Sequence, residues 1–182
     1  MKYTDIAINA VKSAIERQKH LKAQEKVLKA EYQAENITAK EFRKQQEEIR
    51  RQLQSSNAEA QKKLNEIEKA YIQVVHKAAE LDGSKIHEDA KLLQLDLKMT
   101  PQQFEALVTK HRENPLMQQL LREYSDKHDG LYADMVPSPT AKAEEFAGFI
   151  RTAVNAVRTP DCLQAAMFVE GRYTPQCCTE SE

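Results

Sequence analysis

Residues 39–81 of this chain read AKEFRKQQEEIRRQLQSSNAEAQKKLNEIEKAYIQVVHKAAEL, and they decide the fold. Mostly apolar residues return at alternating steps of three and four, the pattern of a helix that buries one stripe. The stripe consists of Phe42, Gln46, Ile49, Leu53, Ser56, Ala60, Leu64, Ile67, Tyr71, Val74, Ala78 and Leu81. A helix of this length would span about 65 Å, so we expect part of it to project or to pair with another chain.

The spacing of the stripe changes once, near its middle. The step from Ala60 to Leu64 is four residues where three are due, and such a stutter locally unwinds a supercoil. It follows Ser55-Ser56-Asn57, which consists of weak helix formers. The sequence therefore predicts a bend or fraying of the helix at this place.

The first 35 residues carry a second stripe with the same spacing. Its members are Ala7, Val11, Ala14, Gln18, Leu21, Glu25, Leu28 and Tyr32. Asn36 is expected to end this helix in the left-handed conformation, and Thr38 to Glu41 has the form of a capping box that starts the next helix. A connection this short permits only an antiparallel return. The sequence thus predicts a long helical hairpin, or antiparallel coiled coil.

Shorter helices are expected after the hairpin. Gly83 is predicted at the position just past the end of the long helix, followed by a short helix over residues 86–97. Thr100-Pro101 and Asn114-Pro115 each supply an N-cap and a proline at the first helical position, and Gly130 closes that pair. The predicted fold class is all-α: a long antiparallel hairpin followed by a bundle of shorter helices.

The remainder of the chain is predicted to form a linker, two helices and a tail. Prolines at 137 and 139 indicate a linker, a helix is expected over residues 141–158, and Thr159 before Pro160 is expected to cap a last short helix ending at Gly171. The predicted organisation is a hairpin at 1–82, a small helical subdomain at 83–130, a linker at 131–140, a helical pair at 141–171 and a flexible tail at 172–182.

Motifs for catalysis or metal binding do not stand out. The four glycines lie too far apart for a phosphate-binding loop, and the five histidines form neither H-x-x-x-H nor H-E-x-x-H. His87-Glu88-Asp89 groups three possible ligands, but neighbouring residues on a helix point in different directions, so a solvated helix start is expected. The sequence predicts a non-enzymatic protein with no catalytic residue, no cofactor and no metal site.

The three cysteines are expected to be reduced thiols. Their odd number, without an export signal, argues against a disulfide framework. Cys177 and Cys178 lie in the predicted tail; Cys162 would lie in the first turn of a helix, where the dipole lowers a thiol pKa, but no histidine follows His128 to act as its base. No stretch is apolar enough for a signal core or a membrane span, so a cytoplasmic protein without membrane contact is expected.

Charge does not identify a partner class. The chain has 27 basic and 28 acidic residues, so a general polyanion-binding protein is not indicated. A basic stripe nevertheless runs along the first helix, formed by Lys12, Lys19 and Lys26 with Lys22 and Lys29 on the adjacent row. We favour a solvated outer face for it, and contact with a phosphate backbone or an acidic protein is the alternative.

The segment after the hairpin carries a resemblance. KMTPQQFEAL at 98–107, Asn114-Pro115 and LLREY at 120–124 look similar to small helical proteins encoded by phages and prophages of Gram-positive bacteria. A charged coiled coil followed by a small helical domain also resembles phage head scaffolding proteins in organisation. This resemblance implies a class of protein and transfers no functional residue.

We therefore expect a protein–protein interaction protein that acts through its hairpin, with an assembly or scaffolding role. The alternatives are an inhibitor that docks on a host defence effector such as a CRISPR nuclease, and a nucleic-acid binder that uses the lysine stripe. Polar positions in the stripes, Gln18, Glu25 and Gln46, are expected to leave surface for a partner. The candidate partner-binding residues are Phe42, Ile49, Leu53, Leu64, Lys12, Lys19, Lys22, Lys26 and Lys29.

Overall fold

A computed structural model describes residues 3–95, 97–128, 130 and 132–173 of the chain. These residues form seven α-helices and two short 3-10 helices and contain no strand, which confirms the all-α prediction. The elements are α1 (Tyr3–Gln33), α2 (Ala39–Ala78), η1 (Gly83–Lys85), α3 (Ala90–Gln94), α4 (Pro101–Lys110), α5 (Pro115–Lys127), η2 (Ala133–Met135), α6 (Pro139–Arg158) and α7 (Leu163–Glu170).

The chain divides into two compact units. Unit 1 comprises residues 1–70 and 145–182, and unit 2 comprises residues 71–144. The division differs from the predicted one, because the C-terminal helices group with the hairpin and the last turns of α2 group with the shorter helices. None of the helices in the described part of the chain is long and apolar enough to cross a membrane.

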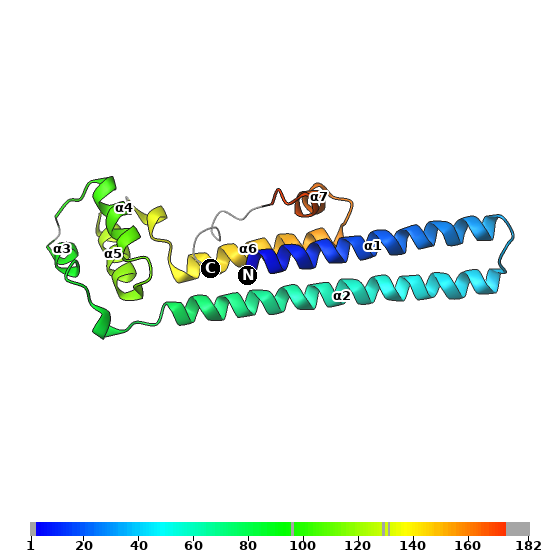
Figure 1. Cartoon of the computed structure of the whole chain (residues 1–182), viewed down its shortest axis with the longest axis horizontal. Helices are drawn as coiled ribbons and strands as arrows, with labels where there is room; N and C mark the ends of the chain where they lie inside the picture. The colour runs from blue at the N-terminus through cyan, green and yellow to red at the C-terminus, as the bar shows by residue number, and fades with distance from the viewer. Residues whose placement is uncertain (1–2, 96, 129, 131, 174–182) are drawn as a thin grey trace. The chain divides into compact units, whose positions relative to one another are not determined.

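The hairpin of unit 1 is present as predicted, with α1 and α2 antiparallel (Figure 1). The chain leaves α1 through a Schellman motif, in which the Asn36 amide donates to the Glu31 carbonyl and the Glu35 amide to the Tyr32 carbonyl. Glu35 has φ of 58°, so Glu35, and not Asn36 as predicted, takes the left-handed conformation. The turn therefore places a side chain with a Cβ where glycine is preferred.

The predicted capping box at the start of α2 is confirmed. The Thr38 amide donates to the Glu41 carboxylate at 2.9 Å, and the Glu41 amide donates to the Thr38 hydroxyl at 3.3 Å. The predicted fraying at Ser55-Ser56-Asn57 is wrong, since α2 continues through it. Ser56 is buried and the Asn57 side chain accepts a hydrogen bond from Gln18, so tertiary contacts compensate for the weak local preference.

A third helix completes the core of unit 1. Figure 1 shows α6 beside the N-terminal half of α1, running in the same direction. Gln18, which is buried on α1, donates to the carbonyl of Val157 on α6 at 2.8 Å and also to Asn57 on α2. Val157 lies in the last turn of α6, where carbonyls lack an intrahelical partner, so Gln18 satisfies one of them. The buried apolar residues of this unit include Val11, Ile15, Leu64, Ile150, Val157 and Phe168.

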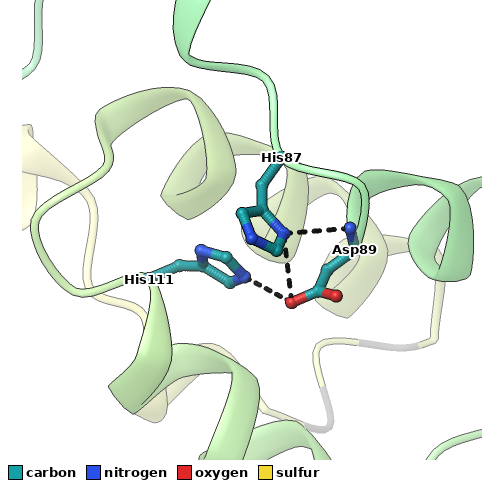
Figure 2. A group of neighbouring side chains, drawn as sticks. All are labelled: His87, Asp89 and His111. Carbon is teal, nitrogen blue, oxygen red and sulfur yellow. Dashed lines mark hydrogen bonds and ion pairs between the residues drawn. The ribbon is translucent and has the colours of Figure 1, made fainter.

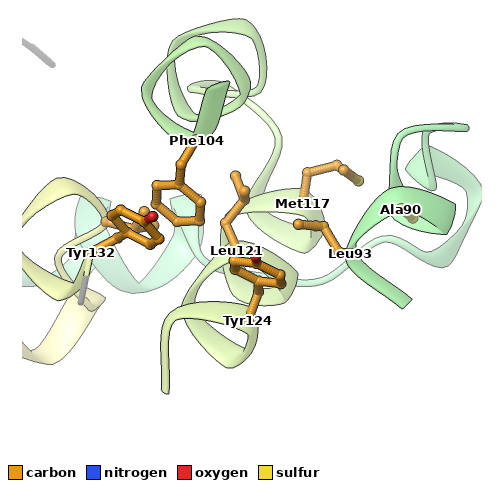
Figure 3. Close-up of a cluster of buried hydrophobic side chains, with 8 residues drawn as sticks. Ala90, Leu93, Phe104, Met117, Leu121, Tyr124 and Tyr132 are labelled. Atoms are coloured by element: carbon orange, nitrogen blue, oxygen red, sulfur yellow. The ribbon is translucent and has the colours of Figure 1, made fainter. Parts of the chain in front are cut away.

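Unit 2 has a separate aromatic core (Figure 3). Phe104 stacks on Tyr132 with ring centroids 4.5 Å apart and on Tyr124 at 5.8 Å. The Tyr124 hydroxyl donates to the Leu97 carbonyl at 2.7 Å and accepts from the Met99 amide at 3.0 Å. These bonds hold the segment before α4 against α5. The buried residues of this core are Ala90, Leu93, Phe104, Met117, Leu121, Tyr124, Tyr132 and Val136.

Most of the predicted helix boundaries in the second half of the chain are confirmed. Thr100 forms a complete capping box with Gln103, and the Asn114 side chain caps α5. Gly130 and Gly171 both have positive φ, as expected for residues that end helices. Local capping chemistry therefore determined these boundaries.

Three local predictions are wrong. Gly83 does not end α2, which stops at Ala78, but opens the 3-10 helix η1. The helix expected over 86–97 is reduced to the five residues of α3, because the segment around it is held by tertiary hydrogen bonds. Cys162, and not Thr159, caps α7. Most of the predicted tail, including Cys177 and Cys178, lies outside the described residues.

Candidate functional site

The part of the hairpin beyond the contact between Gln18 and Asn57 forms a surface of its own. We define residues 19–55 as the distal hairpin. In the proximal part of α2, Leu64 is fully buried and Ala60 is 8% exposed. In the distal hairpin, the stripe residues Phe42, Ile49 and Leu53 are only partly buried. The apolar stripe of α2 thus continues into the distal hairpin, where its side chains are no longer fully buried.

A groove runs along the distal hairpin between α1 and α2. It has a volume of about 590 Å³ and is lined by His20, Ala23, Gln24, Val27, Leu28, Glu31, Gln45, Glu48 and Ile49. Val27 is 58% exposed, although the neighbouring Leu28 is buried at 3%. The groove therefore combines an apolar floor with both acidic and imidazole side chains.

The tip of the hairpin is closed by an aromatic pair. Tyr32 and Phe42 stack with ring centroids 4.5 Å apart and an angle of 19° between the rings. Tyr32 remains 42% exposed. Because the stack joins the last turn of α1 to the first turn of α2, it holds the tip in register and presents an aromatic edge to solvent.

Two lysines of the predicted stripe, Lys22 and Lys12, lie against the C-terminal segment of unit 1. Lys22 pairs with Asp161, between α6 and α7, at 2.6 Å. This hydrogen bond lowers the pKa of Asp161, with the charges of Lys19 and Lys26 adding to the effect. Lys12 Nζ lies 3.8 Å from where a Cβ on Gly171 would be, beside the C-terminus of α7, where the helix dipole favours a cation.

Several sequence-predicted binding residues therefore have structural roles. Leu64 is a core residue with no exposed surface, and Gln18 is used within the protein instead of facing a partner. Lys29 pairs with Glu25 one turn away at 2.7 Å. Among the apolar candidates, Phe42, Ile49 and Leu53 remain partly exposed. The predicted lysines Lys19 and Lys26 are exposed. The structure adds Val27, which the spacing rule missed because it lies outside the stripe.

A second cluster of functional side chains lies in unit 2 (Figure 2). His87 and Asp89 precede α3, and His111 is the residue after the last turn of α4. His111 Nε2 lies 2.7 Å from Asp89 Oδ2, and His87 Nδ1 lies 3.4 Å from the same oxygen. One ligand atom from each residue lies within 4.8 Å of the others.

Electrostatics keep the carboxyl group of this cluster ionised. Lys110 Nζ lies 2.7 Å from Asp89 Oδ2. The hydrogen bonds from Lys110 and then from His111 lower the pKa of Asp89 to about 2. His111 is 5% exposed, whereas the side chains of His87 and Lys110 are half exposed. The cluster is thus anchored on its His111 side and open to solvent on its His87 side.

Sequence reasoning missed this cluster because His111 follows Asp89 by 22 residues. His87-Glu88-Asp89 was interpreted as the start of a helix whose side chains diverge. Instead, residues 87–89 precede α3 in a turn in which the Asp89 amide donates to His87 Nδ1 at 3.1 Å, so the two side chains lie close together. The packing of α4 against α3 and α5 then adds His111, which no local pattern signals.

Cys162 has a capping role. Its thiol accepts a hydrogen bond from the Ala165 amide at 3.4 Å, which lowers the thiol pKa.

Comparisons of the chain with family models, curated proteins and solved structures find no match.

Proposed function

We propose that the chain is a protein–protein interaction protein that self-associates through its distal hairpin and serves in assembly. The observation that carries this proposal is the change in burial along α2, from the fully buried Leu64 to the partly exposed Ile49 and Leu53. An apolar stripe that continues beyond its intramolecular cover is typical of a helical surface that packs against further helices.

The groove gives this surface a specific shape. Val27, Leu28 and Ile49 form an apolar strip into which side chains of another helix can pack, as in the core of a four-helix bundle. Two helices alone bury little surface, and in unit 1 the proximal part obtains its third helix from α6. The distal hairpin would obtain its additional helices from a partner.

A second copy of the chain is the occupant that the charges support. Residues 19–55 contain nine Lys and Arg and six Glu. In a twofold symmetric pair, each patch meets an identical patch, so an interface of this kind needs both signs of charge within one surface. Glu31 and Glu48 on the groove can meet lysines and arginines of the other copy around a shared apolar strip.

The test is a charge placed in the groove. Val27→Glu changes a side chain that is mostly exposed, so the monomer should remain folded, while a buried carboxylate in the interface should abolish association. Val74→Glu is the matched control, because Val74 is a valine on α2 that is 48% exposed and does not line the groove. Sedimentation velocity across a concentration series should show association for wild type and Val74→Glu and a monomer for Val27→Glu.

Two results would decide against self-association. A wild-type chain that stays monomeric at about 100 µM would refute self-association, since an interface that serves in assembly should have a dissociation constant below that concentration. Equal association of Val27→Glu and wild type would show that the contact lies elsewhere. A monomer that captures a different protein through Val27 would support the inhibitor hypothesis instead.

A further inference from the structure

We propose that His87, Asp89 and His111 form a binding site for a divalent transition-metal ion of the Zn²⁺ type in unit 2. The three side chains come from two separate segments and converge on one point, as Figure 2 shows. Two imidazole nitrogens and one carboxylate oxygen are a ligand set that Zn²⁺ accepts, with water in a fourth position. The site is independent of the distal hairpin and of its proposed function.

The distances fit such an ion after small side-chain movements. In a tetrahedral zinc site with bonds of about 2.0–2.2 Å, neighbouring ligand atoms lie about 3.3 Å apart. His87 Nδ1 and Asp89 Oδ2 are already 3.4 Å apart, and His111 Nε2 is 2.7 Å from that oxygen. The three ligand atoms all lie within 4.8 Å of one another, so His111 would move away from the carboxylate and the two imidazoles would turn toward the ion.

The hydrogen bond of His87 determines which of its ring nitrogens carries the lone pair next to Asp89. Its Nδ1 accepts from the Asp89 amide at 3.1 Å, so in the neutral ring this nitrogen carries a lone pair and not a hydrogen. Nδ1 also lies 3.4 Å from the carboxylate oxygen of Asp89, so an ion between them would take this lone pair in place of the amide. The Lys110 ammonium supplies a positive charge on this oxygen at 2.7 Å, and a metal ion bound to both His87 and Asp89 would take over that role.

Without metal, the Asp89 carboxylate receives hydrogen bonds from His111 and Lys110. His111 Nε2, as the hydrogen-bearing tautomer, donates to Asp89, and Lys110 places an ammonium on the same oxygen. Metal binding requires the other tautomer of His111, in which Nε2 carries the lone pair. It also requires Lys110 to leave, and the side chain of Lys110 is 54% exposed and free to rotate into water. Lys110 therefore competes with the ion.

The ion would fasten the segment before α3 to the end of α4. His87 and His111 are 24 residues apart in sequence, and the segment between them holds α3, α4 and the connection from Leu95 to Thr100. A metal bridge between two such segments restricts the unfolded chain and stabilises the folded unit. Mg²⁺ should not substitute, because it prefers an octahedral set of oxygen ligands.

The experiment measures Zn²⁺ binding by calorimetry to the full chain with Cys162→Ser, Cys177→Ser and Cys178→Ser, so that thiols do not contribute. One equivalent of Zn²⁺ should bind, and Mg²⁺ should not compete. His87→Ala should weaken binding by at least about 100-fold, since loss of even an outer-shell partner costs 10- to 100-fold. His76→Ala, which removes an exposed histidine outside the cluster, is the matched control and should bind as the parent does.

Further variants separate binding from folding. His111→Ala removes a buried side chain and should destabilise the unit, whereas His87 is exposed enough that its removal should leave the circular dichroism spectrum unchanged. Lys110→Met should bind Zn²⁺ about tenfold more tightly, because a competing cation is gone. The proposal is overturned if the parent does not bind Zn²⁺, if His87→Ala binds as well as His76→Ala, or if Lys110→Met leaves the affinity unchanged.

Discussion

Gln18 is the residue on which the arrangement of three helices in unit 1 depends. Its side chain is 2% exposed, and its amide donates to Val157 on α6 and to Asn57 on α2. Gln18→Glu keeps the shape of the side chain but replaces the donor with an acceptor. The variant should destabilise unit 1 because three acceptors would then face one another without a hydrogen between them.

The magnitude follows from the lost bonds and the buried charge. Each hydrogen bond contributes about 1 kcal/mol, and desolvation of a carboxylate adds a penalty of several kcal/mol that protonation can limit. We expect a loss of about 3 kcal/mol in the free energy of unfolding at pH 7. With a urea slope of about 2 kcal/mol/M, the midpoint of the unit 1 transition should fall by about 1.5 M.

The pH dependence provides an internal check on this reasoning. Burial raises the pKa of the introduced carboxyl in the folded protein above its unfolded value of about 4.3. A raised folded pKa means that the variant is least destabilised below the unfolded pKa, where the carboxyl is protonated in both states and can donate again. The destabilisation should therefore shrink at pH 4 and grow as pH rises to 7.

Urea unfolding followed by circular dichroism at both pH values measures the effect. Gln54→Glu is the matched control, because Gln54 is exposed on α2 and its change should stay within about 0.5 kcal/mol. A Gln18→Glu variant within about 0.5 kcal/mol of wild type at pH 7 would refute the role assigned to Gln18. A loss that does not depend on pH would refute the electrostatic explanation.

The turn of the hairpin gives two further predictions. Glu35→Gly should stabilise the protein by about 0.5–1 kcal/mol in urea unfolding, since glycine adopts positive φ without strain. As a control, Glu31→Gly inside α1 should destabilise the protein by about 1 kcal/mol. A loss of stability in Glu35→Gly would contradict the assignment of Glu35 as the left-handed residue. Hydrogen bonds from the side chain and amide of Thr38 lower the pKa of Glu41. The pKa of Glu41 is therefore lower in the folded than in the unfolded protein. The stability that results is present above pH 4.5 and is lost as the pH falls through the folded pKa. Glu41→Gln should accordingly be less stable than wild type at pH 7 in thermal unfolding, and the difference should shrink as the pH falls below 4.5. A difference that does not shrink with falling pH would count against this explanation.

Local chemistry in the sequence was sufficient for the helices and many of their ends. Capping at Thr38, Thr100 and Asn114 involves residues within one turn, so a side chain and the backbone beside it determine the outcome. The stripe of α2 was predicted correctly over most of its length, from Phe42 to Tyr71, because the helical repeat alone places those residues on one face.

Predictions failed where a distant segment outweighed local preference. The helix expected over residues 86–97 is mostly absent because Tyr124 fixes the backbone at Leu97 and Met99. The weak helix formers at Ser55-Ser56-Asn57 stay helical because Gln18 pairs with Asn57. In both cases a hydrogen bond that spans more than twenty residues decides the local conformation.

For the candidate sites, the sequence by itself determined a hairpin with an apolar stripe and a row of lysines. Only the tertiary structure decided that α6 and α7 associate with the hairpin as far as Lys22, which pairs with Asp161, and that Val27 and Ile49 lie at an open groove. It also brought His111 to His87 and Asp89. The physical reason is that periodicity specifies which face of a helix is buried, whereas the residues that meet across that face depend on how distant helices pack.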